Sequence, residues 1–173
     1  DPSDHPFDDV RVLDNPHYSF LDKVLHLEST PYERTLYLDT DTYVDSDVSE
    51  VFELLDRFDI GAAYNHNREA VPLETVPRSF PEYNTGVVVY ENNERVQALF
   101  DRWKDLYRAK MDDHPHDQPA FREALYESGV RVATLPTEYN CLVRYPGHVR
   151  NTVKIFHSRL LDLDTPGAGK SVE

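Results

Sequence analysis

The chain has 173 residues, about the length of one domain, and 39% of them are apolar, as in globular proteins. Its 32 acidic residues outnumber its 18 basic residues and give a formal net charge of −14, which makes nucleic acid and anionic lipid poor partners. No apolar run approaches the roughly 20 residues of a transmembrane segment, and the single cysteine, Cys141, excludes an internal disulfide.

The charged residues are unevenly placed. Residues 131–159 carry five basic residues against one acidic residue, a net +4 in an otherwise acidic chain. Such an island favours an anionic small ligand such as a diphosphate, or it pairs with the acidic part of the same chain. The 19 Asp and only 5 Lys are typical of a halophilic protein, and the first nine residues lack the apolar core of a signal peptide. We therefore expect a cytoplasmic location.

Apolar periodicity, together with helix and turn signals, predicts the elements of the first half of the chain. In chain order they are a short strand over 10–13, a helix over 20–28 capped by Ser19, a buried strand over 35–38, a short helix through Leu55 capped by Asp47 or Ser49, and a strand over 58–64. Residues 65–82 are polar and contain three prolines, which predicts an irregular loop of functional length.

The second half continues the alternation of strands and helices. The expected elements are a buried strand over 84–90, a long helix capped by Asn92 or Asn93, a helix that opens at Asp117-Gln118-Pro119 and ends at Gly129, strands over 130–135 and 153–156, and a loose tail over 160–173. Because several strands are continuously apolar, we expect an α/β fold with a mostly parallel central sheet flanked by helices. Such sheets bind ligands at the carboxyl ends of their strands.

Asp39-Thr40-Asp41 lies at such a strand end, directly after the buried run Leu36-Tyr37-Leu38. Residues i and i+2 of an extended chain point the same way, so both carboxylates face one side. Two carboxylates together favour Mg²⁺ or Mn²⁺, which also bridge phosphate oxygens. Two other Asp-x-Asp triplets occur in the chain, but only this one directly follows a buried strand.

The sequence around this triplet resembles the metal-binding core of nucleotide-sugar glycosyltransferases with the GT-A fold. It is most similar to glycosyltransferase family 8, the group of glycogenin and the lipopolysaccharide galactosyltransferases. The motifs that carry the likeness follow one another in the family's order over roughly residues 20–160. The first motif is Lys23 together with Glu33–Thr42. The others are Tyr83–Val89, which resembles the family's Asn-small-Gly strand; His116–Ala120, which resembles its Asp-Gln helix start; Leu135–Asn140; and Lys154–His157, which resembles its late strand ending in a histidine.

The resemblance implies a role for each matching residue. Asp39, Asp41 and His157 would hold Mn²⁺ or Mg²⁺, with Asp39 also near the ribose. The remaining implied contacts are with the donor: Lys23 with its sugar or phosphate, Asn84 and Gly86 in the sugar pocket, Asp117 and Gln118 as the catalytic pair on the sugar hydroxyls, and Tyr139 and Asn140 as further substrate contacts.

The resemblance also implies the overall activity. Residues 1–173 would form a single GT-A-like domain that moves a sugar from a nucleotide-diphosphate sugar donor to a glycan, lipid or protein hydroxyl, with retention of configuration. The family often has Gly and Lys after the late histidine, and here Arg159 would grip the diphosphate instead.

Only nine residues precede Val10, which leaves little room for the strand and helix that usually open the family and hold the nucleoside base. The chain is then a fragment without that first strand, or it binds the base differently, or it is a degenerate, non-catalytic binding module. A further alternative is a haloacid-dehalogenase-type phosphatase, whose nucleophile strand Leu36–Asp41 also resembles, although Tyr43 stands where that group has Thr or Val.

Overall fold

The computed structural model describes residues 7–66 and 70–158, so Arg159 and the tail expected over 160–173 lie outside the described residues. The elements alternate as the sequence predicts. In chain order they are α1 (Phe20–His26), η1 (Leu27–Ser29), β1 (Arg34–Leu38), β2 (Thr42–Val44), η2 (Ser49–Asp56), β3 (Ile60–Tyr64), β4 (Tyr83–Glu91), α2 (Glu94–Lys110), α3 (Gln118–Glu127), β5 (Val132–Leu135), η3 (Thr137–Tyr139), β6 (Cys141–Leu142) and β7 (Ile155–His157), where η denotes a 3-10 helix.

The strands form two sheets, one with the order β1-β4-β3-β5 and a smaller one with the order β2-β7-β6. Strand β4 runs antiparallel to both β1 and β3, whereas β3 and β5 are parallel. The α/β class is therefore confirmed, but the expectation of a mostly parallel sheet is wrong for two of the three pairings. The apolar run in β4 indicates that the strand is buried on both faces, which is usual in a parallel sheet. A central antiparallel strand is buried on both faces too when both faces of its sheet are covered, so the apolar run does not reveal the direction of β4.

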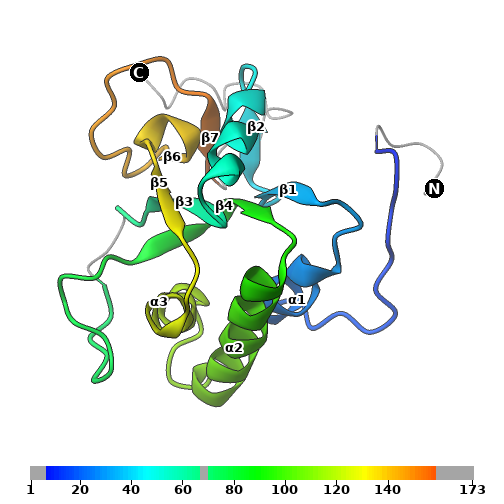
Figure 1. Ribbon diagram of the computed structural model, residues 1–173, viewed down its shortest axis with the longest axis vertical. Coiled ribbons are helices and arrows are strands. Elements are labelled where there is room, and N and C mark those ends of the chain that lie inside the picture. Colours follow the sequence, from blue (N-terminus) through cyan, green and yellow to red (C-terminus); the bar gives the residue numbers. More distant parts are fainter. Residues whose placement is uncertain (1–6, 67–69, 159–173) are drawn as a thin grey trace.

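Helices and the small sheet cover opposite faces of the four-stranded sheet, with α1, α2 and α3 below it and β2, β6, β7 and η2 above it in Figure 1. Alternate residues of β4 enter two separate cores because side chains alternate across a strand. Val88 and Tyr90 pack into the core with the helices, whereas Val87 and Val89 pack into the core with η2 and β7.

Two helix starts follow the capping signals in the sequence, whereas η2 has Val48 at its N-cap instead of the expected Asp47 or Ser49. Ser19 accepts a hydrogen bond from the Leu21 backbone N–H and forms a capping box with Asp22, and Asn93 accepts from the backbone N–H groups of Arg95 and Val96. Asp117 occupies the N-cap position of α3, but its side chain makes no capping hydrogen bond. That carboxylate points elsewhere, to the contacts of the candidate site.

The described part of the loop between β3 and β4 is irregular, as expected, and is anchored to α3 by Arg122. The guanidinium of Arg122 is almost wholly buried and donates to the backbone carbonyls of Val71, Pro77 and Phe80 at 2.8–2.9 Å. A planar group with fixed donors suits this task. The loop is thus held in place although it contains little regular structure.

The strand expected over 10–13 is absent: these residues are irregular, and Val10 and Val12 are exposed. A short apolar run forms a strand only where a sheet edge pairs with it, and no such pairing forms here. Among the described residues, no helix combines the length and apolar character that crossing a bilayer requires.

Candidate functional site

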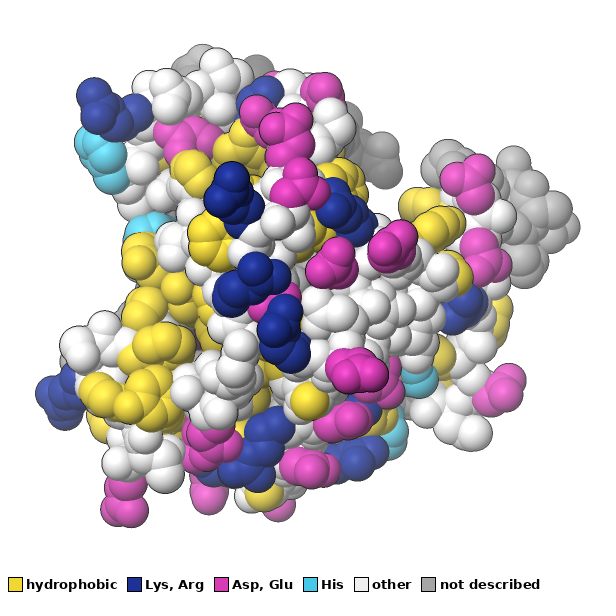
Figure 2. Space-filling model, in the orientation of Figure 1, with side chains coloured by type: hydrophobic (Ala, Val, Ile, Leu, Met, Phe, Trp, Pro, Cys, Tyr) yellow, Lys and Arg dark blue, Asp and Glu magenta, His cyan; other side chains and the backbone are white. Residues whose placement is uncertain are grey.

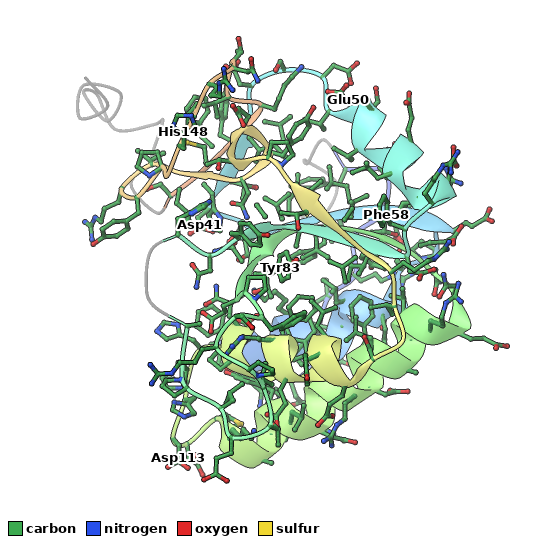
Figure 3. All side chains as sticks on the ribbon, turned by 60° about the vertical axis from the view of Figure 1, so that its left-hand side comes forward. Asp41, Glu50, Phe58, Tyr83, Asp113 and His148 are labelled. Carbon is green, nitrogen blue, oxygen red and sulfur yellow. The ribbon has the colours of Figure 1, made fainter. Side chains whose placement is uncertain are left out.

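The candidate site lies where β1 and β3 end and β4 begins. The first residue after β1, Asp39, donates its backbone N–H to the Gly86 carbonyl of β4 at 2.8 Å. In Figure 3, Asp41 lies at the left-hand side and Phe58, which precedes β3, lies at the right-hand side. The site therefore occupies the carboxyl ends of the parallel-running strands, as expected for an α/β sheet.

A tight turn and the small sheet bring His157 to the two aspartates. The Thr42 backbone N–H and hydroxyl both donate to the Asp39 carbonyl, at 3.1 and 2.7 Å, which closes the turn. Strand β2 then pairs antiparallel with β7 so that Thr42 lies opposite His157. As a result, Nε2 of His157 lies 3.3 Å from Oδ1 of Asp41.

Asp39, Asp41 and His157 form a group whose ligand atoms all lie within 4.8 Å of one another. Carboxylate oxygens suit Mg²⁺ and Mn²⁺, and an imidazole nitrogen adds a ligand that transition metals accept. The residues present therefore fit a divalent cation such as Mn²⁺. The structure brings together the three side chains that the resemblance assigned to the metal.

Neighbouring side chains fix the Asp39 carboxylate from both sides. The Tyr37 hydroxyl donates to Oδ1 at 2.6 Å, and Nζ of Lys23 lies 3.4 Å from Oδ2. Burial and the adjacent Asp39 carboxylate raise the pKa of Tyr37 above its ordinary value, so the hydroxyl stays protonated and donates. Asp39 is thereby held in one orientation before any ligand arrives.

Lys23 lies between two acidic side chains rather than on the surface. Its ammonium group is 3.0 Å from Oδ2 of Asp117, 3.4 Å from Oδ2 of Asp39 and 3.1 Å from the Thr85 hydroxyl, and its side chain is only 7% exposed. An ammonium group has three donors, and these contacts use all three. In this structure Lys23 is a buried counter-charge, whereas the resemblance implied contact with the donor.

Asp117 is fully buried, and its two oxygens have different surroundings. Oδ2 accepts from the Thr85 hydroxyl at 2.7 Å and pairs with Lys23, whereas Oδ1 has no hydrogen-bond partner within the described residues. A buried acceptor without a partner is uncommon and points to a ligand or water at that position. Gln118 follows as the half-buried first residue of α3.

Asn84, Gly86 and Asn140 lie beneath the cluster, not at its surface. Asn84 and Asn140 are 3% and 2% exposed and hydrogen-bond to each other, and Asn140 also contacts Nδ1 of His157 at 2.8 Å. A Cβ atom on Gly86 would lie 2.2 Å from Cε1 of His157. The space beside Gly86 is filled by the His157 ring, and the implied contacts of these residues with the donor sugar stay predictions.

The sequence profile of nucleotide-diphospho-sugar transferases matches residues 21–157, a span that contains Lys23, the Asp-x-Asp turn and His157. The chain belongs to the nucleotide-diphospho-sugar transferase family. No curated protein sequence matches it.

Solved structures of glycosyltransferases share the fold of this transferase chain. They include mouse xyloside xylosyltransferase 1 (19% identity, TM-score 0.54, covering 85% of this chain and 64% of that one). The glycosyltransferase GlyE of Streptococcus pneumoniae TIGR4 is 17% identical with a TM-score of 0.61, and the match covers 84% of this chain and 39% of that one. The galactosyltransferase LgtC in complex with donor and acceptor sugar analogs is 16% identical with a TM-score of 0.62, and the match covers 92% of this chain and 67% of that one. At these identities the likeness shows a GT-A-like fold. The chain spans between 39% and 67% of the length of these three chains.

Two further residues that the resemblance implied are Tyr139, which contacts another part of the molecule, and Arg159, which lies outside the described residues. The Tyr139 hydroxyl donates to Glu50 of η2, which raises the pKa of Tyr139 to about 12. Glu50 lies at the top of Figure 3, far from the label of Asp41. Tyr139 therefore packs against η2, and Arg159 is not described.

The basic island over 131–159 is at least partly paired within the chain. Arg131 binds Asp59, and Lys154 donates to the Asp47 carbonyl. Figure 2 shows Lys and Arg side chains gathered near the middle of one face, with acidic side chains among them. Of the two interpretations of the island, pairing with an acidic side chain therefore applies to Arg131.

Two residues of the candidate site, Tyr37 and Thr85, were not predicted from the sequence. Tyr37 precedes Asp39 by two residues, so the alternation of a strand places both on one side, a signal that was present in the sequence. Thr85 lies inside the Asn-small-Gly motif, but its partners Lys23 and Asp117 come from distant parts of the chain. No local pattern predicts that contact.

Proposed function

We propose that this chain is a metal-dependent glycosyltransferase that moves a sugar from a nucleotide-diphosphate sugar to an acceptor hydroxyl. The family supports the donor class, and the resemblance to family 8 supports retention of configuration. The observation that carries the proposal is the convergence of the Asp39/Asp41 pair with His157, which follows it 116 residues later in the sequence, at the carboxyl end of the sheet. The acceptor is a hydroxyl of a glycan, a lipid or a protein.

Asp39, Asp41 and His157 would hold the cation, Mn²⁺ or Mg²⁺, through one carboxylate oxygen each and one imidazole nitrogen. When bound, such an ion neutralises negative charge on the diphosphate, a contribution of several kcal/mol to transition-state stabilisation. The local charge favours this role. Lys23 pairs with Asp39 and Asp117, and Asp41 lies beside His157. The acidic side chains of this group thus outnumber its one lysine, and a divalent cation would balance them.

Asp117 and Gln118 are the residues that we assign to the donor sugar. The unpartnered Oδ1 of Asp117 would accept a hydrogen bond from a sugar hydroxyl, which would satisfy an acceptor that is otherwise buried without a partner. Gln118 would add an amide contact from the start of α3. These contacts would fix the sugar so that its anomeric carbon faces the acceptor.

The transfer itself forms one bond and breaks one. The bond between the anomeric carbon and the phosphate oxygen breaks, and its electron pair leaves with the nucleoside diphosphate. The acceptor oxygen forms the new bond to the anomeric carbon, and its proton passes to the departing phosphate oxygen. Preorganised positive charge and hydrogen-bond donors around that leaving group lower the barrier.

The experiment compares binding by the wild-type chain, Asp41→Asn and Asp45→Asn. Asp45 belongs to another Asp-x-Asp triplet but is exposed and outside the cluster, so it is a matched control. Mn²⁺ affinity is measured by electron paramagnetic resonance, and donor binding by thermal melting with UDP- and GDP-sugars. At about 100 times the Kd, a bound donor adds about 2.7 kcal/mol of stability.

We expect Asp41→Asn to lose most Mn²⁺ affinity and the donor-induced shift, and Asp45→Asn to retain both. Transfer to water or a hydroxyl acceptor, followed by release of nucleoside diphosphate, then tests turnover. A wild-type chain that binds Mn²⁺ without responding to any donor would identify a non-catalytic binding module. A chain that binds neither would contradict the proposal.

A further inference from the structure

A chain of buried hydrogen bonds leads from the backbone of β4 to the ring of His157. The Gly86 backbone N–H donates to the side-chain oxygen of Asn84 at 2.9 Å. The same oxygen accepts from Nδ2 of Asn140 at 2.9 Å, and the side-chain oxygen of Asn140 lies 2.8 Å from Nδ1 of His157. The side chains of Asn84, Asn140 and His157 are all buried.

The direction of this chain is fixed at its backbone end. A backbone N–H can only donate, so the atom of Asn84 that faces Gly86 must be the oxygen. Asn140 must then present its amide nitrogen to that oxygen, and its own oxygen to the imidazole. An oxygen at 2.8 Å from a ring nitrogen requires a hydrogen on that nitrogen, so Nδ1 of His157 carries the proton.

We infer that Asn84 and Asn140 are positioning residues that hold a proton on Nδ1 of His157 and so orient its ring. Nε2, the nitrogen that lies 3.3 Å from Asp41, then faces the acidic cluster. Metal-binding histidines are commonly oriented in this way through their other nitrogen. Gly86 adds to the effect because its missing Cβ leaves the space that the ring occupies.

This inference deepens the proposed function, since the tautomer matters for the activity only if the cluster binds a cation. The position of the proton, however, is a property of the metal-free chain and is measurable without any ligand. The two proposals therefore fail separately: absence of Mn²⁺ binding in the wild-type chain contradicts the metal site, whereas the location of the proton decides the inference about Asn84 and Asn140.

The first measurement is a long-range ¹H–¹⁵N correlation spectrum of the metal-free chain at about pH 8.5, above the ordinary titration range of imidazole. The His157 signals are assigned by their loss in His157→Gln. We expect a protonated Nδ1 and an unprotonated Nε2. A wild-type spectrum with the proton on Nε2 would overturn the inference without recourse to any further variant.

The second measurement uses three variants and a Mn²⁺ titration. Asn140→Leu removes the acceptor, so the proton should populate Nε2 and Mn²⁺ affinity should fall about 10- to 100-fold. Asn140→Asp retains the acceptor oxygen but loses the donor to Asn84, so it should keep the proton on Nδ1 even where it lowers the melting temperature. Asn65→Leu is the matched control, because Asn65 is also buried but bonds Glu82 and not the imidazole.

We expect Asn65→Leu to leave both the His157 spectrum and the Mn²⁺ affinity unchanged, even where it lowers the melting temperature. A purely structural role for Asn140 predicts a different pattern, in which Asn140→Leu and Asn65→Leu lower stability alike and neither moves the proton. That pattern would overturn the assignment of Asn140 as a positioning residue.

Discussion

Each end of the central sheet contains a fully buried aspartate with basic partners, and the two arrangements differ. At the end where the strands begin, Asp59 accepts hydrogen bonds from the Arg131 backbone and guanidinium and from Arg95. Both guanidinium groups are about half exposed, and they hold the pKa of Asp59 well below its ordinary value. Two basic side chains thus serve one carboxylate, and both of its oxygens are satisfied.

At the end where β1 and β3 finish, the balance is reversed. One basic side chain, Lys23, is shared by Asp39 and Asp117, with Asp41 and His157 close by, and one oxygen of Asp117 has no partner among the described residues. A satisfied buried ion pair needs nothing more and belongs to the fold. An acidic excess with an open acceptor is costly unless a cation or ligand completes it. Asp59 and Asp117 therefore differ in hydrogen-bond satisfaction rather than in burial, which supports a structural role for Asp59 and the proposed donor contact for Asp117.

The largest effect is expected from Lys23→Met. Removal of the ammonium leaves buried Asp117 without its counter-charge, which should lower the free energy of unfolding by about 3–5 kcal/mol, measured by urea denaturation at neutral pH. Turnover should fall by at least about 100-fold, because the aspartates lose their fixed geometry.

The double variant Lys23→Met/Asp117→Leu separates the two effects. Replacement of a buried ion pair by apolar side chains often restores stability, so most of the lost unfolding free energy should return while turnover stays low. If Lys23→Met alone costs less than about 1 kcal/mol, the ammonium group is not the counter-charge that the structure indicates.

A smaller loss of stability and no loss of metal binding are expected from Asp59→Asn. The neutral amide leaves the arginine donors partly unsatisfied, which should cost about 2 kcal/mol at neutral pH. Mn²⁺ affinity should match that of the wild-type chain, because Asp59 lies at the other end of β3. A changed affinity would mean that the two ends of the sheet are coupled.

The same variant has a pH signature whose sign follows from the lowered pKa of Asp59. In acid the unfolded chain takes up this proton before the folded chain does, so the stabilisation is complete above the ordinary carboxyl pKa of about 4 and is lost as pH falls below it. The stability difference between wild type and Asp59→Asn should therefore be constant between about pH 6 and 8 and shrink in acid. A difference that grows in acid would contradict the assignment.

The last two variants change glycines, and the smallest effect is expected from the control at Gly129. Gly86→Ala places a methyl group within 2.2 Å of the His157 ring, so it should displace the ring, cost about 1–3 kcal/mol and weaken Mn²⁺ binding. Gly129→Ala is the matched control, since a Cβ there meets no atom within 4 Å, and it should change stability by less than about 1 kcal/mol. Equal Mn²⁺ affinity in both variants would show that Gly86 does not seat the imidazole.

Much of the fold could be predicted from local signals. The caps at Ser19 and Asn93 and the apolar runs of β1 and β4 act through neighbouring residues, and the observed elements follow them. The direction of β4 could not be predicted, because burial on both faces is compatible with either direction. The strand expected over 10–13 depended on a partner edge, which is a non-local condition.

The candidate site divides in the same way. The sequence by itself determined the Asp-x-Asp turn after an apolar strand and, through an ordered set of short motifs, the late histidine that belongs with it. The strand was expected to be buried, but β1 is only half-buried because it lies at the edge of its sheet. Only the tertiary structure decided that Lys23 is shared between Asp39 and Asp117, that Asn140 supports His157, and that Tyr139 lies against Glu50. The physical reason is that turns and caps depend on neighbours along the chain, whereas counter-charges and hydrogen-bond partners are set by packing between elements that the sequence keeps 16 to 94 residues apart.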